Sequence, residues 1–306
     1  MLSRRHILAG LAGAAIFPSA AFGAVPRRLG LQLYTVGPDA VRDLPGTLAA
    51  VRSIGFTEVE LPNLFGKGPA AIATMLRAAG LGCPSIHVPF DGKGFSLDDV
   101  ERTGEMLATI GARFAVVPIA SLRPKFAAGE DWGLAMTREG VGIGVDGWRR
   151  IAEKLDGAAG RLAKYGVTTG YHNHDLELHP LPDGTTPFDH LSAGTDPRHV
   201  VFEVDIGWVA TAGVDPAAFL RRHASRIRLL HLKDTNGAKS PGTSFSMTPA
   251  EPGRGIVNWH AVAEALRAVP IAHAFVEQEP PFVGPRIESA RRGYAFFNTL
   301  GQGGRK

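Results

Sequence analysis

Imidazole, amine and carboxylate side chains recur in the second half of the chain at spacings that would bring them together. His172 and His174 lie two residues apart, and His231 and Lys233 repeat that spacing. Side chains of a strand alternate between its two faces, so each pair would share one face. Burying such groups is costly unless a cation or a polar ligand satisfies them together. The pattern predicts a metal site or a site for a polar ligand.

Asp205 and Glu277 each follow a short apolar run and are candidates for the same site. With His231 and one histidine of the earlier pair, His172 or His174, they would form a mixed nitrogen and oxygen ligand set. Such a set suits Mn²⁺, Co²⁺, Zn²⁺ or Mg²⁺ and leaves positions open for substrate oxygens. The chain has one cysteine, so we expect no multi-cysteine metal site and no internal disulfide.

Four further residues are candidates for contact with a substrate. Glu60 and His87 are expected at strand ends, Glu177 follows the histidine pair, and Trp208 would offer a flat face to a sugar ring. Each also has a structural interpretation, as an ion-pair partner, a core histidine, a loop cap or a packing residue. The sequence leaves both interpretations open.

These residues belong to a regular succession of strands and helices. Short β-rich runs are expected at 30–34, 57–61, 82–87, 114–118, 168–174, 200–205, 227–233 and 274–278. Segments with helical spacing are expected at 44–54, 70–79, 97–110, 144–165, 216–223, 259–268 and 285–300. Parallel neighbours need crossover connections, so this alternation predicts a parallel sheet. Eight such units predict an α/β fold, the (β/α)₈ TIM barrel.

The barrel predicts where the chemistry lies. Barrel enzymes keep their active sites at the carboxyl ends of the strands, where the candidate residues are expected. The long connections at 119–143 and 234–258 follow the fourth and seventh strands and are candidate lids. No G-x-G-x-x-G motif follows the first strand, which disfavours an open nucleotide-binding sheet.

Residues 1–23 are expected to be an export signal. Paired arginines precede an apolar run, and Ala21-Phe22-Gly23 offers a cleavage site of the small-x-small type. The arginine pair favours the twin-arginine route, with an ordinary secretory signal as the alternative. We therefore expect a periplasmic or extracytoplasmic protein in which residues 24–306 form a single barrel domain.

The composition excludes several classes of function. The 306 residues are 44% hydrophobic and 20% charged, with a net charge of +4 and no basic run, so no nucleic-acid partner is expected. After the signal, no apolar stretch is long enough to span a bilayer. The expected partner is a small molecule. An oligomer is possible, but the sequence identifies no surface for one.

The motifs at these positions resemble those of the xylose-isomerase-like TIM-barrel superfamily, the sugar phosphate isomerase/epimerase group. They are GLQLYTV at 30–36, YHNHDLEL at 171–178, FEVDIGW at 202–208, LHLKD at 230–234, GRGIVNW at 253–259 and VE at 276–277. The resemblance implies metal ligands on strands five to eight, commonly Glu, Asp, His and Glu. The last three correspond to Asp205, His231 and Glu277. His172 stands where the first Glu is expected.

The resemblance implies a divalent-metal-dependent sugar isomerase or epimerase. The metal would polarise a carbonyl while the neighbouring carbon loses a proton to Glu277 or another group, with Lys233 or His174 as acid or electrostatic partner. Epimerases of this fold are thought to use two opposed carboxylates, of which Glu277 is the one retained. An exported protein would meet non-phosphorylated sugars. One alternative is a keto-glycoside lyase or hydrolase; the lyase would begin with the same proton removal. The other alternative is a non-catalytic carbohydrate-binding barrel.

Overall fold

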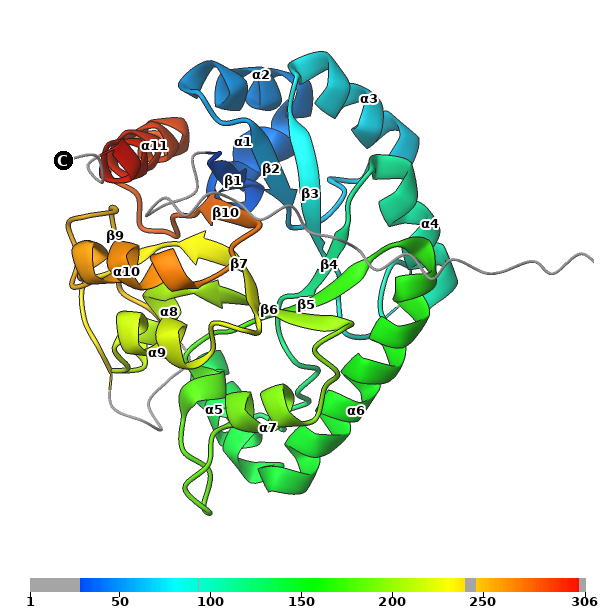
Figure 1. The fold of residues 1–306 in the computed structure, drawn as a ribbon, viewed down its shortest axis with the longest axis vertical. Coiled ribbons are helices and arrows are strands. Elements are labelled where there is room, and N and C mark those ends of the chain that lie inside the picture. The colour runs from blue at the N-terminus through cyan, green and yellow to red at the C-terminus, as the bar shows by residue number, and fades with distance from the viewer. Residues whose placement is uncertain (1–27, 93, 240–245, 303–306) are drawn as a thin grey trace, which may run out of the picture.

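The computed structural model describes residues 28–92, 94–239 and 246–302, so the predicted export signal at 1–23 lies outside the described residues. Parallel strands close into a barrel in the spatial order β1-β10-β7-β6-β5-β4-β3-β2 (Figure 1). The strands are β1 (Gly30–Gln32), β2 (Glu58–Leu61), β3 (Gly82–His87), β4 (Phe114–Val117), β5 (Thr168–His172), β6 (Val200–Asp205), β7 (Ile227–Leu232) and β10 (His273–Val276). The predicted (β/α)₈ barrel is confirmed.

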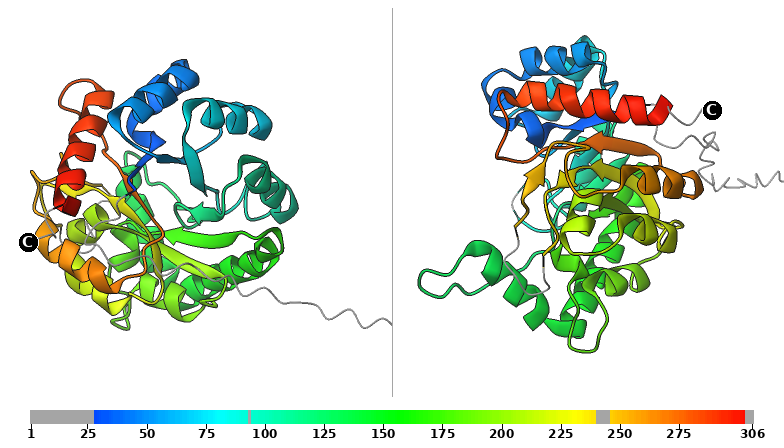
Figure 2. Two further views of the ribbon diagram at one scale, coloured as in Figure 1. Left: turned by 45° about the horizontal axis from the view of Figure 1, so that its top comes forward. Right: turned by 90° about the vertical axis from the view of Figure 1, so that its left-hand side faces the viewer.

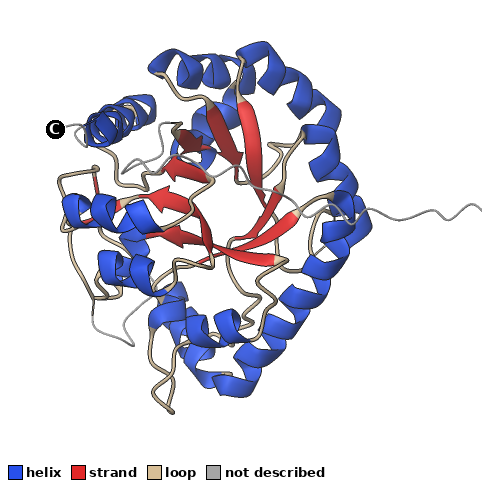
Figure 3. Cartoon of the chain, in the orientation of Figure 1, coloured by secondary structure: helices blue, strands red, loops and turns tan. Residues whose placement is uncertain are grey.

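Helices surround the strands on the outside of the barrel (Figure 3). They are α1 (Gly37–Arg42), α2 (Leu44–Ile54), α3 (Pro69–Ala79), α4 (Val100–Ile110), α5 (Trp132–Gly142), α6 (Gly144–Leu162), α7 (Pro187–Ala193), α8 (Ile206–Thr211), α9 (Pro216–Arg222), α10 (Trp259–Ala265) and α11 (Arg286–Gln302). The last helix, α11, packs beside α2 and closes the ring (Figure 2). Among the described helices, none is long and apolar enough to cross a membrane.

Local sequence signals account for several helix ends. Asp43 and Asp99 cap α2 and α4, and each side chain accepts a hydrogen bond from the backbone N–H three residues later. Gly80 and Gly111 end α3 and α4 with φ values of 68° and 89°, in the left-handed region that glycine adopts without strain. These glycines let the chain turn directly from a helix towards the next strand.

The structure differs from the predicted elements in several places. The connection at 119–143, predicted as a loop, contains α5. The predicted strands at 168–174 and 227–233 end earlier, at His172 and Leu232. Helix α7 was not predicted. It begins after Thr186, whose side chain forms a reciprocal capping box with Asp189.

The inside of the barrel is layered. Five apolar side chains form a cluster separate from the main core: Phe114, Val116, Val201, Leu229 and Phe275. Two positions after the last three, and therefore on the same strand faces, come the polar residues Glu203, His231 and Glu277. The apolar layer closes the barrel beneath the polar groups.

The connection after β7 is fastened to the barrel by Asp234. This residue begins β8 (Asp234–Thr235), which pairs with β9 (Pro249–Ala250) in a small antiparallel sheet. The buried Asp234 carboxylate accepts hydrogen bonds of 2.9–3.2 Å from the backbone N–H groups of Thr235, Gly253, Gly255 and Val257 and from the indole N–H of Trp259. One side chain therefore holds both ends of this connection.

Candidate functional site

Asp205, His231 and Glu277 lie together at the carboxyl ends of β6, β7 and β10, and we call them the rim group. Asp205 is paired with His231 across the β6–β7 ladder. Its Oδ1 accepts a hydrogen bond from Trp208 N at the start of α8, which fixes the carboxylate. His231 Nδ1 lies 2.7 Å from Glu277 Oε2 and 3.8 Å from Asp205 Oδ2. The structure thus brings together three residues that are far apart in the sequence.

Lys233 places a positive charge inside this group. Its Nζ lies 2.9 Å from Asp205 Oδ2, 2.8 Å from Glu277 Oε2 and 2.6 Å from Glu279 Oε1. Burial alone would lower the pKa of the Lys233 ammonium, but the three carboxylates outweigh it and raise that pKa well above its usual value. Burial would raise the pKa of Glu277, but Lys233 and His231 hold it well below its usual range. Both groups are therefore charged.

The two histidines of the β5 end face this charge. His172 Nε2 lies 3.8 Å from Asp205 Oδ2, so His172 is the strand-five residue next to the rim group. The His174 ring centroid lies 4.9 Å from that of His172 and 5.0 Å from that of Trp208. Burial, reinforced by positive neighbours such as Lys233, lowers the pKa of both imidazoles well below the usual value. Both rings are therefore neutral, and His174 is the less buried of the two.

A second set of polar side chains lies deeper in the barrel. His87, His172, Glu203 and His231 come from β3, β5, β6 and β7, and we call them the deep group. Sequence analysis assigned no role to Glu203. The signal was available, because Glu203 lies two residues before Asp205 on the same strand and must share its face. Glu60 joins the deep group, with its Oε2 2.6 Å from His231 Nε2.

The predicted substrate residues occupy different surroundings. Glu60 is fully buried and accepts hydrogen bonds from Gln32 and Ser85. Glu177 is also fully buried, and it accepts hydrogen bonds of 2.7 Å from Tyr171 Oη and from His174 N. Glu177 therefore positions the backbone of His174.

The other two predicted substrate residues are Trp208, beside His174 and Lys233, and His87, in the deep group. The Trp208 ring forms a wall beside His174, and Lys233 Nζ lies 5.7 Å from its ring centroid. His87 is partly buried and stacks on His231, with 5.7 Å between the ring centroids. Contact of Glu60, His87, Glu177 and Trp208 with a substrate stays a prediction.

Asp175 is a buried carboxylate at the start of the turn after β5. In the described part of the chain, neither of its oxygens has a hydrogen-bond partner. Burial and the nearby Glu177 charge raise the pKa of Asp175 to about 7. His179 Nε2 lies 3.9 Å from Asp175 Oδ2. Asp175 therefore titrates in the physiological range.

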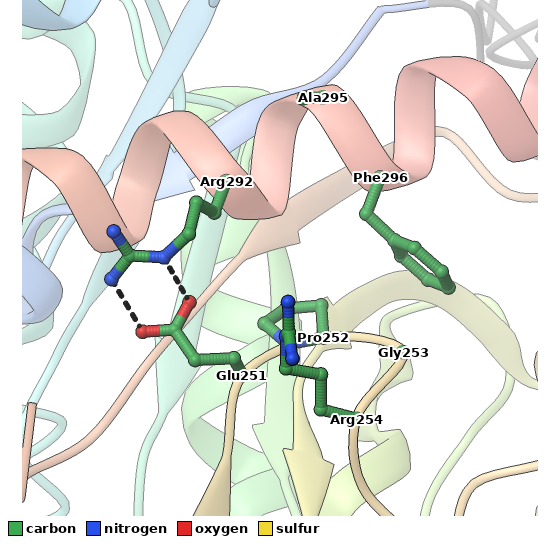
Figure 4. A pocket seen from close by; sticks show the side chains of 7 residues that line it. All are labelled: Glu251, Pro252, Gly253, Arg254, Arg292, Ala295 and Phe296. Atoms are coloured by element: carbon green, nitrogen blue, oxygen red, sulfur yellow. Dashed lines mark hydrogen bonds and ion pairs between the residues drawn. The ribbon is translucent and has the colours of Figure 1, made fainter. Parts of the chain in front are cut away.

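A hollow of about 460 Å³ lies away from these residues, between the segment 251–254 and α11 (Figure 4). Arg292 forms two hydrogen bonds with Glu251 along its edge. Gly253 has a φ of +79°, and a Cβ at this position would collide with the Phe296 ring. The hollow contains none of the predicted site residues, so we place the chemistry at the barrel mouth.

The residues of the rim group fit a divalent metal ion. Asp205, His231 and Glu277 each offer a ligand atom, and these atoms lie within 4.8 Å of one another. The Lys233 ammonium already lies between Asp205 Oδ2 and Glu277 Oε2, which shows that this position attracts a cation. Carboxylate and imidazole ligands together suit Zn²⁺, Mn²⁺ and Co²⁺.

Comparison with known proteins identifies relatives of the chain. An inosose dehydratase of Geobacillus thermodenitrificans is 28% identical, over 76% of this chain and 81% of its own length. A rhizopine catabolism protein of Rhizobium meliloti is also 28% identical, over 72% of this chain and 69% of its own length.

The fold has close counterparts among solved structures. A sugar phosphate isomerase/epimerase from Parabacteroides distasonis superposes with a TM-score of 0.68 at 20% identity, over 93% of this chain and 96% of its own. Residues 48–300 match the family described as the xylose isomerase-like TIM barrel. This match covers most of the barrel, including all residues of the rim and deep groups. The chain belongs to the xylose isomerase-like TIM barrel family.

Proposed function

We propose that this protein is a metal-dependent lyase that removes water from a polyhydroxylated ketone, a keto-sugar or an inosose. The observation that carries this proposal is the asymmetry of the barrel mouth. A charged Lys233 and an ionised Glu277 stand on one side, and the neutral imidazoles of His172 and His174 stand on the other. Epimerisation with two opposed carboxylates would need a carboxylate at the position of His172.

The residues present divide the elimination between them. A divalent ion held by Asp205, His231 and Glu277 would supply Lewis-acid polarisation of the substrate carbonyl. His174, which is neutral, accepts the proton from the carbon next to the carbonyl. Lys233, which keeps its charge, stabilises the negative charge that develops on the carbonyl oxygen.

The second half of the reaction returns that proton. The imidazolium of His174 donates it to the hydroxyl on the next carbon as the C–O bond breaks and a C=C bond forms. Water leaves, and His174 is neutral again. One imidazole thus serves as base and then as acid, and Glu177, which holds the backbone N–H of His174, keeps the ring in place.

The relatives support this reaction class over the isomerase or epimerase reaction. An inosose carries a ketone in a ring of hydroxyl groups, so a group one carbon beyond the acidic C–H is always available to leave. The dehydratase of Geobacillus thermodenitrificans covers most of this chain. Isomerisation or epimerisation would begin with the same proton removal, and the test below separates the outcomes.

The test is incubation of the metal-loaded protein with a panel of inososes and keto-sugars in heavy water. We expect each substrate molecule to lose one water. Mass spectrometry and the absorbance of the conjugated product measure this loss. His174→Gln should reduce turnover by about 10²–10⁴ without releasing the metal, whereas His190→Gln, at an outer helix, should not change turnover.

Other outcomes identify other functions. A product that keeps every oxygen and gains deuterium next to the carbonyl would refute the lyase in favour of an isomerase or epimerase. Solvent oxygen in the product without carbon-bound deuterium would indicate a hydrolase. Tight binding of a sugar without conversion, and without dependence on metal, would indicate a carbohydrate-binding barrel.

We also propose that the protein acts outside the cytoplasm, in the periplasm of a bacterium. The support is the arginine pair and apolar run within residues 1–23. Cell fractionation with the wild-type chain and with Arg4→Lys/Arg5→Lys tests this proposal. Export of the wild type and retention of the variant are expected, and equal distribution would refute the twin-arginine route.

A further inference from the structure

We propose that the deep group, His87, His172, Glu203 and His231, binds a divalent metal ion of its own, separate from an ion in the rim group. The four residues come from β3, β5, β6 and β7, and each offers one ligand atom within 4.8 Å of the others. The inference does not depend on the reaction that the protein catalyses. It concerns a closed site beneath the barrel mouth.

The distances within the group match those of a tetrahedral metal site. Glu203 Oε2 lies 3.0 Å from His172 Nδ1, 3.2 Å from His231 Nε2 and 3.3 Å from His87 Nε2. Zinc–nitrogen and zinc–oxygen bonds of about 2.0–2.1 Å in a tetrahedron separate neighbouring ligand atoms by roughly 3.3 Å. The three nitrogens therefore stand at the required spacing from the carboxylate oxygen, and the four residues each offer a ligand atom within 4.8 Å of the others.

Hydrogen bonding alone accounts poorly for Glu203. Three imidazole nitrogens crowd around Oε2, whereas Oε1 is buried and has no hydrogen-bond partner in the described part of the chain. A carboxylate that only accepts hydrogen bonds has equal capacity at both oxygens. A carboxylate that binds a metal through one oxygen would gather the other ligands around that oxygen. The asymmetry favours a metal ligand.

The surroundings are those of a structural site. Glu203 and His231 are fully buried and His172 is nearly so. Beneath the deep group lies the apolar layer that includes Val201, Leu229 and Phe275. A structural metal site is closed and fully ligated by protein, whereas a catalytic one keeps an open position. A second buried carboxylate, Glu60, lies beside the site, with its Oε2 2.6 Å from His231 Nε2 and 3.3 Å from His87 Nε2, and adds negative charge there.

His231 can belong to both groups, because its two ring nitrogens face in different directions; with an ion in each group it would bridge them as an imidazolate that has lost both ring protons. Nδ1 lies 2.7 Å from Glu277 in the rim group, and Nε2 lies 3.2 Å from Glu203 in the deep group. His172 is arranged in the same way, with Nδ1 towards Glu203 and Nε2 towards Asp205. Residues that belong to one group alone are therefore the ones to change: His87 and Glu203 for the deep group, Asp205 and Glu277 for the rim group.

The test is the metal content of the purified protein after loading with Zn²⁺ and removal of excess ion. We expect two equivalents in the wild type, one in Asp205→Asn/Glu277→Gln, and one in His87→Gln. His273→Gln is the matched control, because His273 pairs with Glu58 at the opposite end of the barrel and should leave two equivalents. Circular dichroism establishes that each variant is folded.

Cobalt supplies a second readout, from the visible spectrum. Tetrahedral Co²⁺ absorbs visible light strongly, and five- or six-coordinate Co²⁺ absorbs weakly. Titration of the metal-free wild type should give the strong spectrum, and His87→Gln should give only the weak one.

The outcomes separate this proposal from the proposed function. One equivalent that is lost in Asp205→Asn/Glu277→Gln and kept in His87→Gln, with a weak cobalt spectrum in the wild type, would overturn the deep site. One equivalent that is lost in His87→Gln and kept in the rim variant would support the deep site and remove the metal from the proposed lyase.

Discussion

Replacing Lys233 with methionine removes an ammonium group that three carboxylates surround. Asp205 and Glu277 are buried, and removing one partner of a buried ion pair costs about 3–5 kcal/mol because the other charge is left uncompensated. The Glu279 side chain is 24% exposed, so its pair contributes at most about 1 kcal/mol. His231 still lies 2.7 Å from Glu277. We therefore expect a loss of about 3 kcal/mol in the free energy of unfolding of the metal-free protein.

A divalent ion in the rim group would replace the missing charge. With the ion bound, the methionine variant should be as stable as the wild type, although it is about 3 kcal/mol less stable without the ion. The coupling free energy between Lys233 and ion binding is therefore also about 3 kcal/mol. Because 1.4 kcal/mol corresponds to a factor of ten, the variant should bind the ion roughly 100-fold more tightly than the wild type. Lys233 and the ion thus compete for Asp205 and Glu277.

Urea denaturation with EDTA and with excess Zn²⁺, together with calorimetric titration of Zn²⁺, measures both quantities. Lys154→Met is the matched control, since Lys154 pairs with Asp98 at the surface and should change stability by less than about 1 kcal/mol. Equal stability of Lys233→Met and the wild type in EDTA would refute the burial argument. Equal affinity for Zn²⁺ would refute the competition.

Three further predictions concern single residues. The pKa of about 7 for Asp175 lies above that of the unfolded chain, so the stability that its protonated form contributes is lost as pH rises towards 7. Between pH 5 and pH 8, the unfolding free energy of Asp175→Asn should rise by about 3 kcal/mol relative to that of the wild type, as measured by urea denaturation. A difference between the two proteins that does not change with pH would contradict this. Asp234→Asn leaves buried N–H groups short of acceptors and should lower the unfolding free energy by about 3 kcal/mol. Asp39 is only partly buried and pairs with the exposed Arg42, so Asp39→Asn should lower the unfolding free energy by less than about 1 kcal/mol. His174→Gln should reduce kcat by about 10²–10⁴ with unchanged metal content, and loss of metal in that variant would count against its role as the base.

The barrel could be predicted because local signals repeat in every unit. The predicted limits of β3, β6 and α2 agree with the structure, since apolar runs and cap residues define these elements within a few residues of chain. Helix α5 could not be found in the same way, because Gly133, Gly140 and Gly142 made its segment resemble a loop. The Leu176 side chain packs so closely against Gly140 that a Cβ there would collide with it, so tertiary contact decides this segment.

The sequence could predict most of the residues of the site, but not the contacts between their side chains. Strand alternation placed His231 and Lys233 on one face, and Asp205 was identified from its place at a strand end; alternation from Asp205 would also have found Glu203. The position of Lys233 between two buried carboxylates depends on the pairing of β7 with both β6 and β10, which brings distant parts of the chain together. The hydrogen bond from Tyr171 to Glu177 depends on a turn after β5 whose shape no local pattern specifies.

The fastening of the β7 connection by Asp234 has a consequence for how this barrel can change. Because one carboxylate secures both ends of the connection, the stretch between residues 237 and 247 can be lengthened, shortened or exchanged while Lys233 and His231 keep their places. The connection leaves the barrel directly after Lys233, at the carboxyl end of β7. New preferences for the shape of a sugar ring can therefore arise by replacement of one connection, with the ligand set inherited unchanged.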